Sequence, residues 1–234
     1  MSRVVTFGEI MLRLAPLGYN RLFQDDKMLA TFGGAEANVA VSLANFGVDT
    51  AFVTKIPDNP IGASAIAELR RMGVDTSDIT IGGDRLGVYY MEKGAGARGS
   101  VCIYDRAYSA ISEATSSDFD WNEILDGVDW FHFTGITPAL SDSTARLCED
   151  ACIEAKKRNI KVSCDLNYRG KLWTRDKANK VMTHLCKYVD VCIANEEDAK
   201  DVFGIEALDT DITGGKLNHE GYKSVARELV DRFG

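Results

Sequence analysis

Hydrophobic and polar positions in the N-terminal part of the chain alternate between strand-like and helix-like patterns. Short apolar or alternating runs predict strands, and longer runs with apolar residues every three to four positions predict helices. The predicted elements are strands at 4–7, 10–16 and 50–56, and helices after Gly34 and at about 61–72. Strands that alternate with helices in this order indicate a parallel sheet with helical crossovers.

The alternation of strands and helices is interrupted between about residues 84 and 108. Two β-rich runs, 86–92 and 100–106, are separated by the glycine-rich segment 93–99 with no helix between them. This pattern predicts an antiparallel hairpin. The glycines at its tip indicate a flexible turn rather than a phosphate-binding loop, because no helix follows them. We therefore expect a small second sheet, called the lid, with strands from about 10–32 and 84–108.

The strand–helix pattern resumes in the C-terminal part, and no internal repeats or low-complexity segments occur. The predicted elements are strands at 129–135, 161–165 and 189–194, helices at about 143–158, 175–188 and 220–233, and a loop at 208–217.

The composition is that of an ordinary globular protein. The chain has 234 residues, of which 45% are hydrophobic and 26% charged. This length suits one large α/β domain over 1–234, with two small domains as the alternative. The net charge of -8 argues against a nucleic-acid partner. No apolar run is long enough to span a bilayer, so the expected location is the cytoplasm. We expect the six cysteines to be reduced thiols, with no disulfide and no zinc site.

Three short groups of residues that can contact a ligand stand at expected strand ends or helix starts. They are the glycine pair Gly33 and Gly34 with Asn38, the segment 165–169 and the segment 195–198. Ligands of open parallel sheets bind beyond the carboxyl ends of the strands. Glycines allow a ligand to approach the backbone, and the start of a helix offers free N–H groups. The three segments together therefore indicate a binding site.

Several motifs resemble the ribokinase-like (PfkB) carbohydrate kinases, and within them the 2-keto-3-deoxygluconate kinases. The motifs are Phe-Gly-Glu at 7–9, Gly-Gly-Ala-Glu-Ala-Asn at 33–38, Tyr-Asp-Arg-Ala-Tyr-Ser-Ala at 104–110, Phe-His-Phe-Thr-Gly-Ile at 131–136 and Asp-Leu-Asn-Tyr-Arg at 165–169. The resemblance implies a three-layer α/β/α fold with a mostly parallel sheet and a small antiparallel β lid. It also implies transfer of a phosphoryl group from Mg-ATP to the terminal hydroxyl of a keto-deoxy sugar acid.

The resemblance also implies which residues contact the sugar. They are Gly33, Gly34, Asn38, Tyr89, Tyr104, Arg106 and Arg169. The carboxylate of a sugar acid favours arginine, whose planar fork of donors matches it. We expect Arg106 from the lid and Arg169 from the end of a sheet strand to converge on that group. Strand packing is an equally good explanation for either tyrosine taken alone.

The phosphate side of the site rests on the same resemblance. It places Asn167, Arg169 and Asn195 towards ATP, and Asp198 towards Mg²⁺ through water. Asp198 stands where the family has a glutamate. An acidic run at the start of a helix, favoured by the helix dipole without any metal, explains Asp198 equally well.

The Gly-Ala-Gly-Asp motif that carries the catalytic base of these kinases does not occur in the chain. The nearest segment, 211–216, lacks the final aspartate. We therefore expect the base and the C-terminal part of the fold beyond Gly234, and residues 1–234 alone to be inactive. Two alternatives stay open: another PfkB sugar kinase, such as a fructokinase-like protein, and a non-catalytic sugar-acid-binding protein. A small exposed sheet also favours a homo-oligomer formed through the lid.

Overall fold

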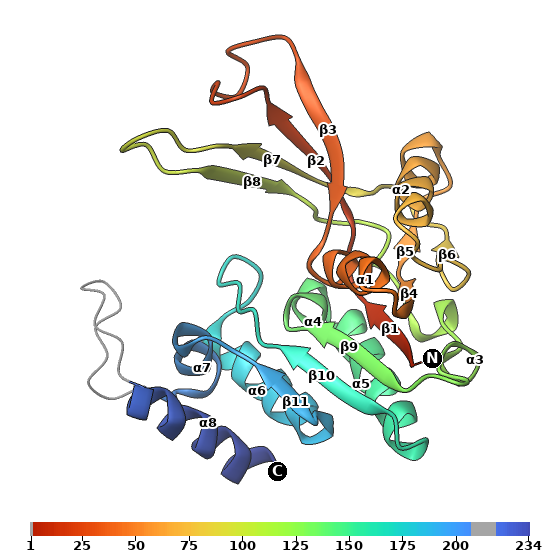
Figure 1. Cartoon of the computed structure of the whole chain (residues 1–234), viewed down its shortest axis with the longest axis vertical. Helices are drawn as coiled ribbons and strands as arrows, with labels where there is room; N and C mark the ends of the chain where they lie inside the picture. The colour runs from red at the N-terminus through yellow and green to blue at the C-terminus, as the bar shows by residue number, and fades with distance from the viewer. Residues whose placement is uncertain (1, 207–218) are drawn as a thin grey trace. The chain divides into compact units, whose positions relative to one another are not determined.

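The computed structural model describes residues 2–206 and 219–234 (Figure 1). The chain divides into two compact units, Met1–Asp129 and Trp130–Gly234. The loop predicted at 208–217 lies outside the described residues, and the single domain predicted over 1–234 stays a prediction. In the part of the chain that is described, no helix is both long enough and apolar enough to cross a membrane.

The first unit contains a parallel strand pair, the lid and their helices. Its elements are β1 (Arg3–Phe7), β2 (Met11–Pro16), β3 (Met28–Gly33), α1 (Ala35–Asn45), β4 (Asp49–Val53), β5 (Lys55–Ile56), α2 (Pro60–Arg71), β6 (Thr80–Ile81), β7 (Gly87–Glu92), β8 (Val101–Asp105) and α3 (Trp121–Ile124), with a 3-10 turn at Ser116–Asp118. β1 and β4 pair in parallel, from Arg3 opposite Asp49 to Phe7 opposite Val53. α1 packs on both strands, as the predicted crossover requires.

The strand predicted at 50–56 is two strands in the structure. β4 pairs with β1, whereas β5 leaves that pair and runs parallel to β6, with Lys55 opposite Thr80. The chain changes partner at the buried Thr54, whose carbonyl oxygen accepts a hydrogen bond of 3.0 Å from the Thr80 N–H. A single apolar run can therefore contribute strands to two sheets, because the backbone N–H and C=O groups of each part form hydrogen bonds with a different neighbouring strand.

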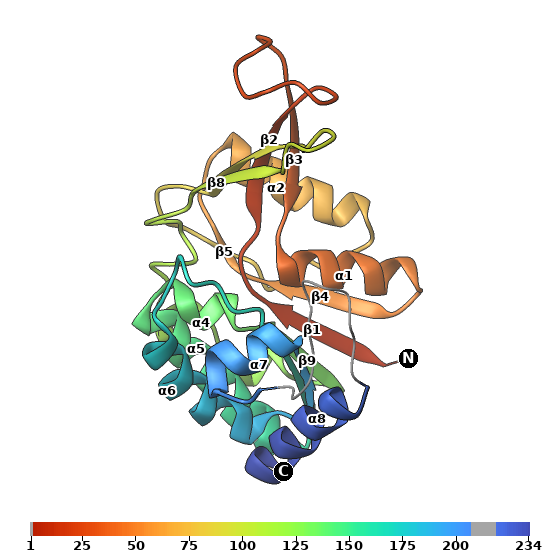
Figure 2. The ribbon, with the colours of Figure 1, turned by 90° about the vertical axis from the view of Figure 1, so that its left-hand side faces the viewer.

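The lid is a four-stranded sheet with the order β3-β2-β7-β8. β2 and β3 are antiparallel, and so are β7 and β8, which confirms the predicted hairpin. The two hairpins join through a parallel pairing of β2 with β7, which the sequence patterns did not predict. Figures 1 and 2 show the two hairpins side by side, extending away from α1 and β4.

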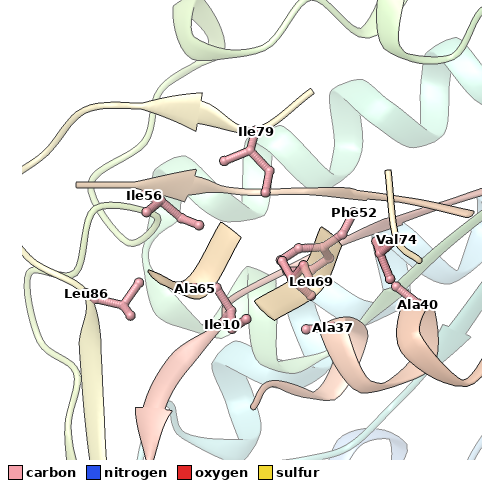
Figure 3. Packing of buried hydrophobic residues seen from close by; sticks show 10 residues of the cluster. All are labelled: Ile10, Ala37, Ala40, Phe52, Ile56, Ala65, Leu69, Val74, Ile79 and Leu86. Atoms are coloured by element: carbon pink, nitrogen blue, oxygen red, sulfur yellow. The ribbon is translucent and has the colours of Figure 1, made fainter. Parts of the chain in front are cut away.

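The base of the lid is anchored in an apolar core within the first unit (Figure 3). Ile10 precedes β2 and Leu86 precedes β7, and both are almost fully buried in this cluster. The other buried members come from α1, α2, β4, β5 and the segments after α2: Ala37, Ala40, Phe52, Ile56, Ala65, Leu69, Val74 and Ile79. Each large apolar side chain buried in this way contributes roughly 1.5–3 kcal/mol. The lid strands therefore start from fixed positions.

The second unit contains three parallel strands covered by helices. Its elements are β9 (Trp130–Thr134), α4 (Ile136–Leu140), α5 (Asp142–Lys157), β10 (Lys161–Asp165), α6 (Arg175–Leu185), β11 (Val191–Ile193), α7 (Glu196–Phe203) and α8 (His219–Phe233), with a 3-10 turn at Cys186–Tyr188. β10 lies between β9 and β11 and pairs with both in parallel. α5 packs against β9 and β10. The three strands and the helices α5, α6 and α8 confirm the predicted pattern, and α4 and α7 are additions to it.

At the start of α1 the backbone lies very close to the backbone of the β1–β2 connection. Gly34 is the N-cap residue in an extended conformation, with φ -168° and ψ 155°. A β-carbon at this position would overlap the carbonyl oxygen of Glu9 in the β1–β2 connection. Gly33 is less constrained, because a β-carbon there would meet the Tyr89 hydroxyl at 3.2 Å, the movable end of a side chain. Close approach, rather than an unusual φ, therefore requires glycine at position 34.

We expect Gly34→Ala to lower the free energy of unfolding by about 1–3 kcal/mol, the typical cost of overpacking. Gly33→Ala should cost less, because the Tyr89 side chain can move. Gly99→Ala is the control, since a β-carbon at Gly99 meets no atom within 4 Å. Urea unfolding of the three variants measures these differences. Equal stability of Gly34→Ala and Gly99→Ala would contradict the proposed contact.

Candidate functional site

One face of the lid collects several of the predicted sugar-binding residues. Directly paired residues on neighbouring strands share a face, and residues two apart on one strand do so as well. Tyr89 of β7 is opposite Tyr104 of β8, and their rings stack with centroids 5.9 Å apart. Arg106 lies two residues after Tyr104 and returns to the same face, where its guanidinium carbon is 5.5 Å from the centre of the Tyr104 ring. This is a cation–π distance.

Tyr89 brings this face to the glycine pair. A β-carbon built on Gly33 would lie 3.2 Å from the Tyr89 hydroxyl oxygen and 3.8 Å from the Asn38 Oδ1. The structure thus brings Gly33, Asn38 and Tyr89 together, with Gly34 adjacent. Burial raises the pKa of Tyr89, so its hydroxyl keeps its proton at neutral pH and can donate a hydrogen bond. The amide of Asn38 is exposed and can both donate and accept.

Arg106 is held in place by a buried carboxylate. Glu9, only 2% exposed, forms an ion pair with the Nη2 of Arg106 and accepts a hydrogen bond of 2.7 Å from the Ser109 hydroxyl. Burial raises the pKa of Glu9, and the positive charge of Arg106 acts against this shift. The Nε of Arg106 is buried without an acceptor among the described residues. The ion pair therefore orients a guanidinium that still has a free donor.

Glu9 has no role implied by the resemblance, although it lies within the Phe-Gly-Glu motif at 7–9. Its signal is a single acidic residue directly after a buried apolar strand and Gly8. Buried acids are rare unless they are paired, so this position predicts a partner. The sequence does not indicate that the partner is Arg106, because the two residues are 97 positions apart.

The polar residues that follow β10 and β11 form one connected cluster in the second unit. The carboxylate of Asp198 accepts a hydrogen bond of 2.9 Å from the Tyr168 N–H, and its own N–H donates to the Asn195 side chain at 2.7 Å. Asn195 is thereby the N-cap of α7. Asn167 lies in the left-handed region with φ 39°. The predicted proximity of these two strand ends is therefore confirmed within the second unit.

Two carboxylates in this cluster interact. The pKa of Asp165 is raised by burial and by the negative charge of Asp198. One or two carboxylates with water and phosphate oxygens are the usual ligands of Mg²⁺, so this donor set fits the ion. Within residues 2–206 and 219–234, three or more His, Cys, Asp or Glu side chains do not gather into a metal cluster. The hydrogen bond from Tyr168 gives Asp198 a structural role, and its role with Mg²⁺ stays a prediction.

Arg169 is exposed, and its guanidinium donates a hydrogen bond of 2.9 Å to the Tyr168 carbonyl oxygen. It belongs to the second unit, whereas Gly33, Asn38, Tyr89, Tyr104 and Arg106 belong to the first. Its convergence with Arg106 on one substrate group stays a prediction.

Comparison with known proteins identifies the class. Residues 1–226 match the model of the pfkB family carbohydrate kinases, and the chain belongs to this family. It is 34% identical over 205 residues to a 2-dehydro-3-deoxygalactonokinase of Haloferax volcanii, covering 88% of this chain and 64% of that protein. It is 31% identical over 214 residues to a 2-dehydro-3-deoxygluconokinase of Thermoproteus tenax, covering 88% of this chain and 63% of the relative. The chain thus spans slightly less than two thirds of the length of these relatives.

A solved structure of a related kinase has the same fold as this chain. The crystal structure of 2-dehydro-3-deoxygluconokinase from Thermotoga maritima superposes with a TM-score of 0.95 at 51% sequence identity. The match covers 100% of this chain and 70% of that chain. The predicted ribokinase-like α/β fold, with a mostly parallel sheet and a small lid sheet, is therefore confirmed.

The two ends of the second unit's sheet contain aspartates with opposite pKa shifts. Asp165 follows β10 and has a raised pKa, as described above. Asp190 precedes β11, and although burial acts to raise its pKa, that pKa is lowered because Asp190 accepts hydrogen bonds. Its donors are the Val162 N–H at 2.9 Å and the side chains of Lys156 at 2.9 Å and Lys161 at 3.2 Å. The two carboxylates should therefore affect stability in opposite directions.

We expect Asp165→Asn to raise the free energy of unfolding at pH 7, because the ionised form of Asp165 is disfavoured in the folded state. This gain should disappear as the pH falls through the raised pKa of Asp165 towards its unfolded value of about 3.9. Asp190→Asn is the matched variant and should lose stability at pH 7. That loss should disappear only as the pH falls through the lowered pKa of Asp190. Urea unfolding at pH 7 and at acidic pH tests both, and shifts of the same sign would contradict this account.

Proposed function

We propose that the complete protein transfers the γ-phosphoryl group of ATP to the terminal hydroxyl of 2-keto-3-deoxygluconate (2-dehydro-3-deoxygluconate). The observation that supports this most strongly is the face formed by Tyr89, Tyr104 and Arg106 close to Gly33 and Asn38. It occurs in a chain of the pfkB family, and relatives of this chain are named as kinases of 2-dehydro-3-deoxy sugar acids.

The chemistry of this face suits a sugar acid. The hydroxyls of Tyr89 and Tyr104 and the amide of Asn38 can form hydrogen bonds with sugar hydroxyls. Arg106 can bind a carboxylate, because Glu9 orients its guanidinium and its buried Nε has no acceptor among the residues that the structure describes. In this proposal Gly33 and Gly34 lie beneath the sugar, where a side chain would occupy space needed by the Tyr89 hydroxyl or the Glu9 backbone.

We assign the ATP phosphates to the cluster after β10 and β11. Asn167, Arg169 and Asn195 supply amide and guanidinium donors, and Asp198 is proposed to hold Mg²⁺ through water. When bound, the ion would neutralise charge on the phosphate oxygens. We assign no catalytic base within residues 1–234, since the Gly-Ala-Gly-Asp motif of the family does not occur there.

We also propose a cytoplasmic location. All six cysteines are free thiols, and four of them are buried: Cys148, Cys152, Cys164 and Cys186. Free thiols are typical of a reducing compartment. The cytoplasm also supplies the ATP that the proposed reaction consumes.

A coupled assay of ATP consumption by the complete protein tests the substrate. We expect kcat/KM for 2-keto-3-deoxygluconate to exceed that for fructose by roughly 10- to 100-fold or more, because fructose lacks the carboxylate that Arg106 would bind. The galactonate epimer serves as a second acid, since a relative is named for it. A preference for fructose would contradict the proposal and favour a fructokinase-like enzyme.

Residues 1–234 alone provide a control for the position of the base. This polypeptide should bind the sugar acid in calorimetry without consuming ATP. Turnover by residues 1–234 would contradict the expected position of the base. Binding without turnover by the complete protein would instead support a non-catalytic sugar-acid-binding protein.

We propose that the lid mediates a homodimer. Apolar side chains on one face of the strand β8 are exposed, Val101 at 43% and Ile103 at 50%. β3 and β8 are also edge strands, and sheet edges favour pairing or coverage by another chain. Apolar surface that is not covered in one chain supports an interface with a second copy.

We expect the complete protein to be a dimer in light scattering at micromolar concentration, and Ile103→Arg to be a monomer, because a charge would then be buried in the interface. Ile61→Arg is the matched control, since Ile61 is 47% exposed on α2 outside the lid. A wild-type monomer, or equal dissociation of both variants, would refute the lid interface.

A further inference from the structure

Arg13 is a basic residue at the centre of the lid for which neither the motifs nor the comparisons indicate a role. It lies in β2 between Leu12, which packs against the apolar core, and Leu14, which is half-buried. The register places Arg13 opposite Thr31 of β3 and opposite Tyr89 of β7, and Tyr89 is opposite Tyr104 of β8. Arg13 therefore belongs to a row across the lid on the same face as the two tyrosines.

The guanidinium of Arg13 has no partner in the part of the chain that is described. The residue is half-buried, and its Nε is buried without a hydrogen-bond acceptor. The other half-buried arginines of the first unit each form an ion pair with a carboxylate: Arg3 with Asp49 and Asp75, Arg85 with Asp105, Arg98 with Glu92, and Arg106 with Glu9. A buried guanidinium donor without an acceptor is unfavourable, so Arg13 differs from these arginines in a way that indicates a ligand.

The positive charge of Arg13 acts on Tyr89, a residue of the proposed sugar site. Burial raises the pKa of the Tyr89 hydroxyl, and the positive charge of Arg13 acts to lower it. That hydroxyl lies beside the position of a β-carbon on Gly33, next to Asn38. The stacked tyrosines consequently have a guanidinium on each side, with Arg13 beside Tyr89 and Arg106 beside Tyr104.

We propose that Arg13 is a further arginine of the substrate site, in addition to Arg106 and Arg169, which binds the carboxylate of the sugar acid and selects acids over neutral sugars. This inference rests on the proposed function, because it requires an anionic substrate on this face of the lid. One donor of Arg106, its Nη2, is paired with Glu9, whereas no donor of Arg13 has a partner among the described residues. A planar guanidinium without an internal partner can contact a carboxylate through two parallel hydrogen bonds.

Isothermal titration calorimetry of the complete protein with 2-keto-3-deoxygluconate and with fructose tests this role. Arg13→Gln should weaken binding of the acid by about 10- to 100-fold, the effect of losing one charge-assisted contact. Binding of fructose should change by less than about threefold. The dependence of acid binding on salt concentration should also become weaker, which a purely structural role would not produce.

Two further variants complete the experiment. Arg71→Gln removes the same charge from α2, where Arg71 is paired with Glu68 away from the lid, and should leave both affinities unchanged. Arg13→Lys keeps the charge but loses the planar fork, and should bind the acid with an intermediate affinity. If Arg13→Gln does not fold, the affinities of Arg13→Lys for the acid and for fructose test the same role.

The outcomes separate this inference from the proposed function. Unchanged acid binding in a folded Arg13 variant, or equal losses for the acid and for fructose, would overturn the role of Arg13 while the proposed function stands. A wild-type protein that binds fructose but not the acid would overturn both. A selective loss of acid binding in Arg13→Gln, with Arg71→Gln like the wild type, supports the inference.

Discussion

The first unit depends on the contacts of a single residue, Glu9. Its carbonyl oxygen lies against Gly34, which leaves no room for a side chain where α1 begins. Its buried carboxylate binds Arg106 and Ser109, which are 97 and 100 residues later in the chain. One residue between β1 and β2 thus fixes both the start of the α1 helix and the end of the lid. Removing either contact would leave an uncompensated charge or a displaced backbone, and both are costly in a packed interior.

The lid has a separate function for each of its two faces. Because side chains alternate along a strand, Ile10, Leu12 and Leu86 belong to the face that packs into the core, while Arg13, Tyr89 and Tyr104 lie on the other. A shift of one residue in the pairing of β2 with β7 would exchange these faces. The apolar anchoring of the base therefore also determines which polar groups are available to a ligand.

The second unit combines structural and chemical roles in the same acidic residues. Asp198 connects the segment after β10 to the start of α7, and its charge raises the pKa of Asp165. Two carboxylates kept this close cost stability, since the charge of Asp198 disfavours ionisation of Asp165. Such an arrangement is typical of a site that receives positive charge, and it agrees with the proposed place of Mg²⁺.

The local pattern of residues determined most of the elements. The glycine pair before an alanine-rich helix and the glycine-rich connection of the hairpin each specify backbone geometry through nearby residues, so they could be predicted without the fold. The motifs likewise indicated the family and the residues proposed to contact the sugar. These features depend on contacts over a few positions.

Only the tertiary structure decided which distant residues meet. It split the run at 50–56 between two sheets, paired β2 with β7 in parallel, and joined Glu9 to Arg106. It also showed that Arg13, a charged residue in an alternating strand, lacks among the described residues the carboxylate partner that comparable arginines have. Such contacts depend on long-range packing and on which buried groups find partners, and the spacing of residues along the chain does not contain that information.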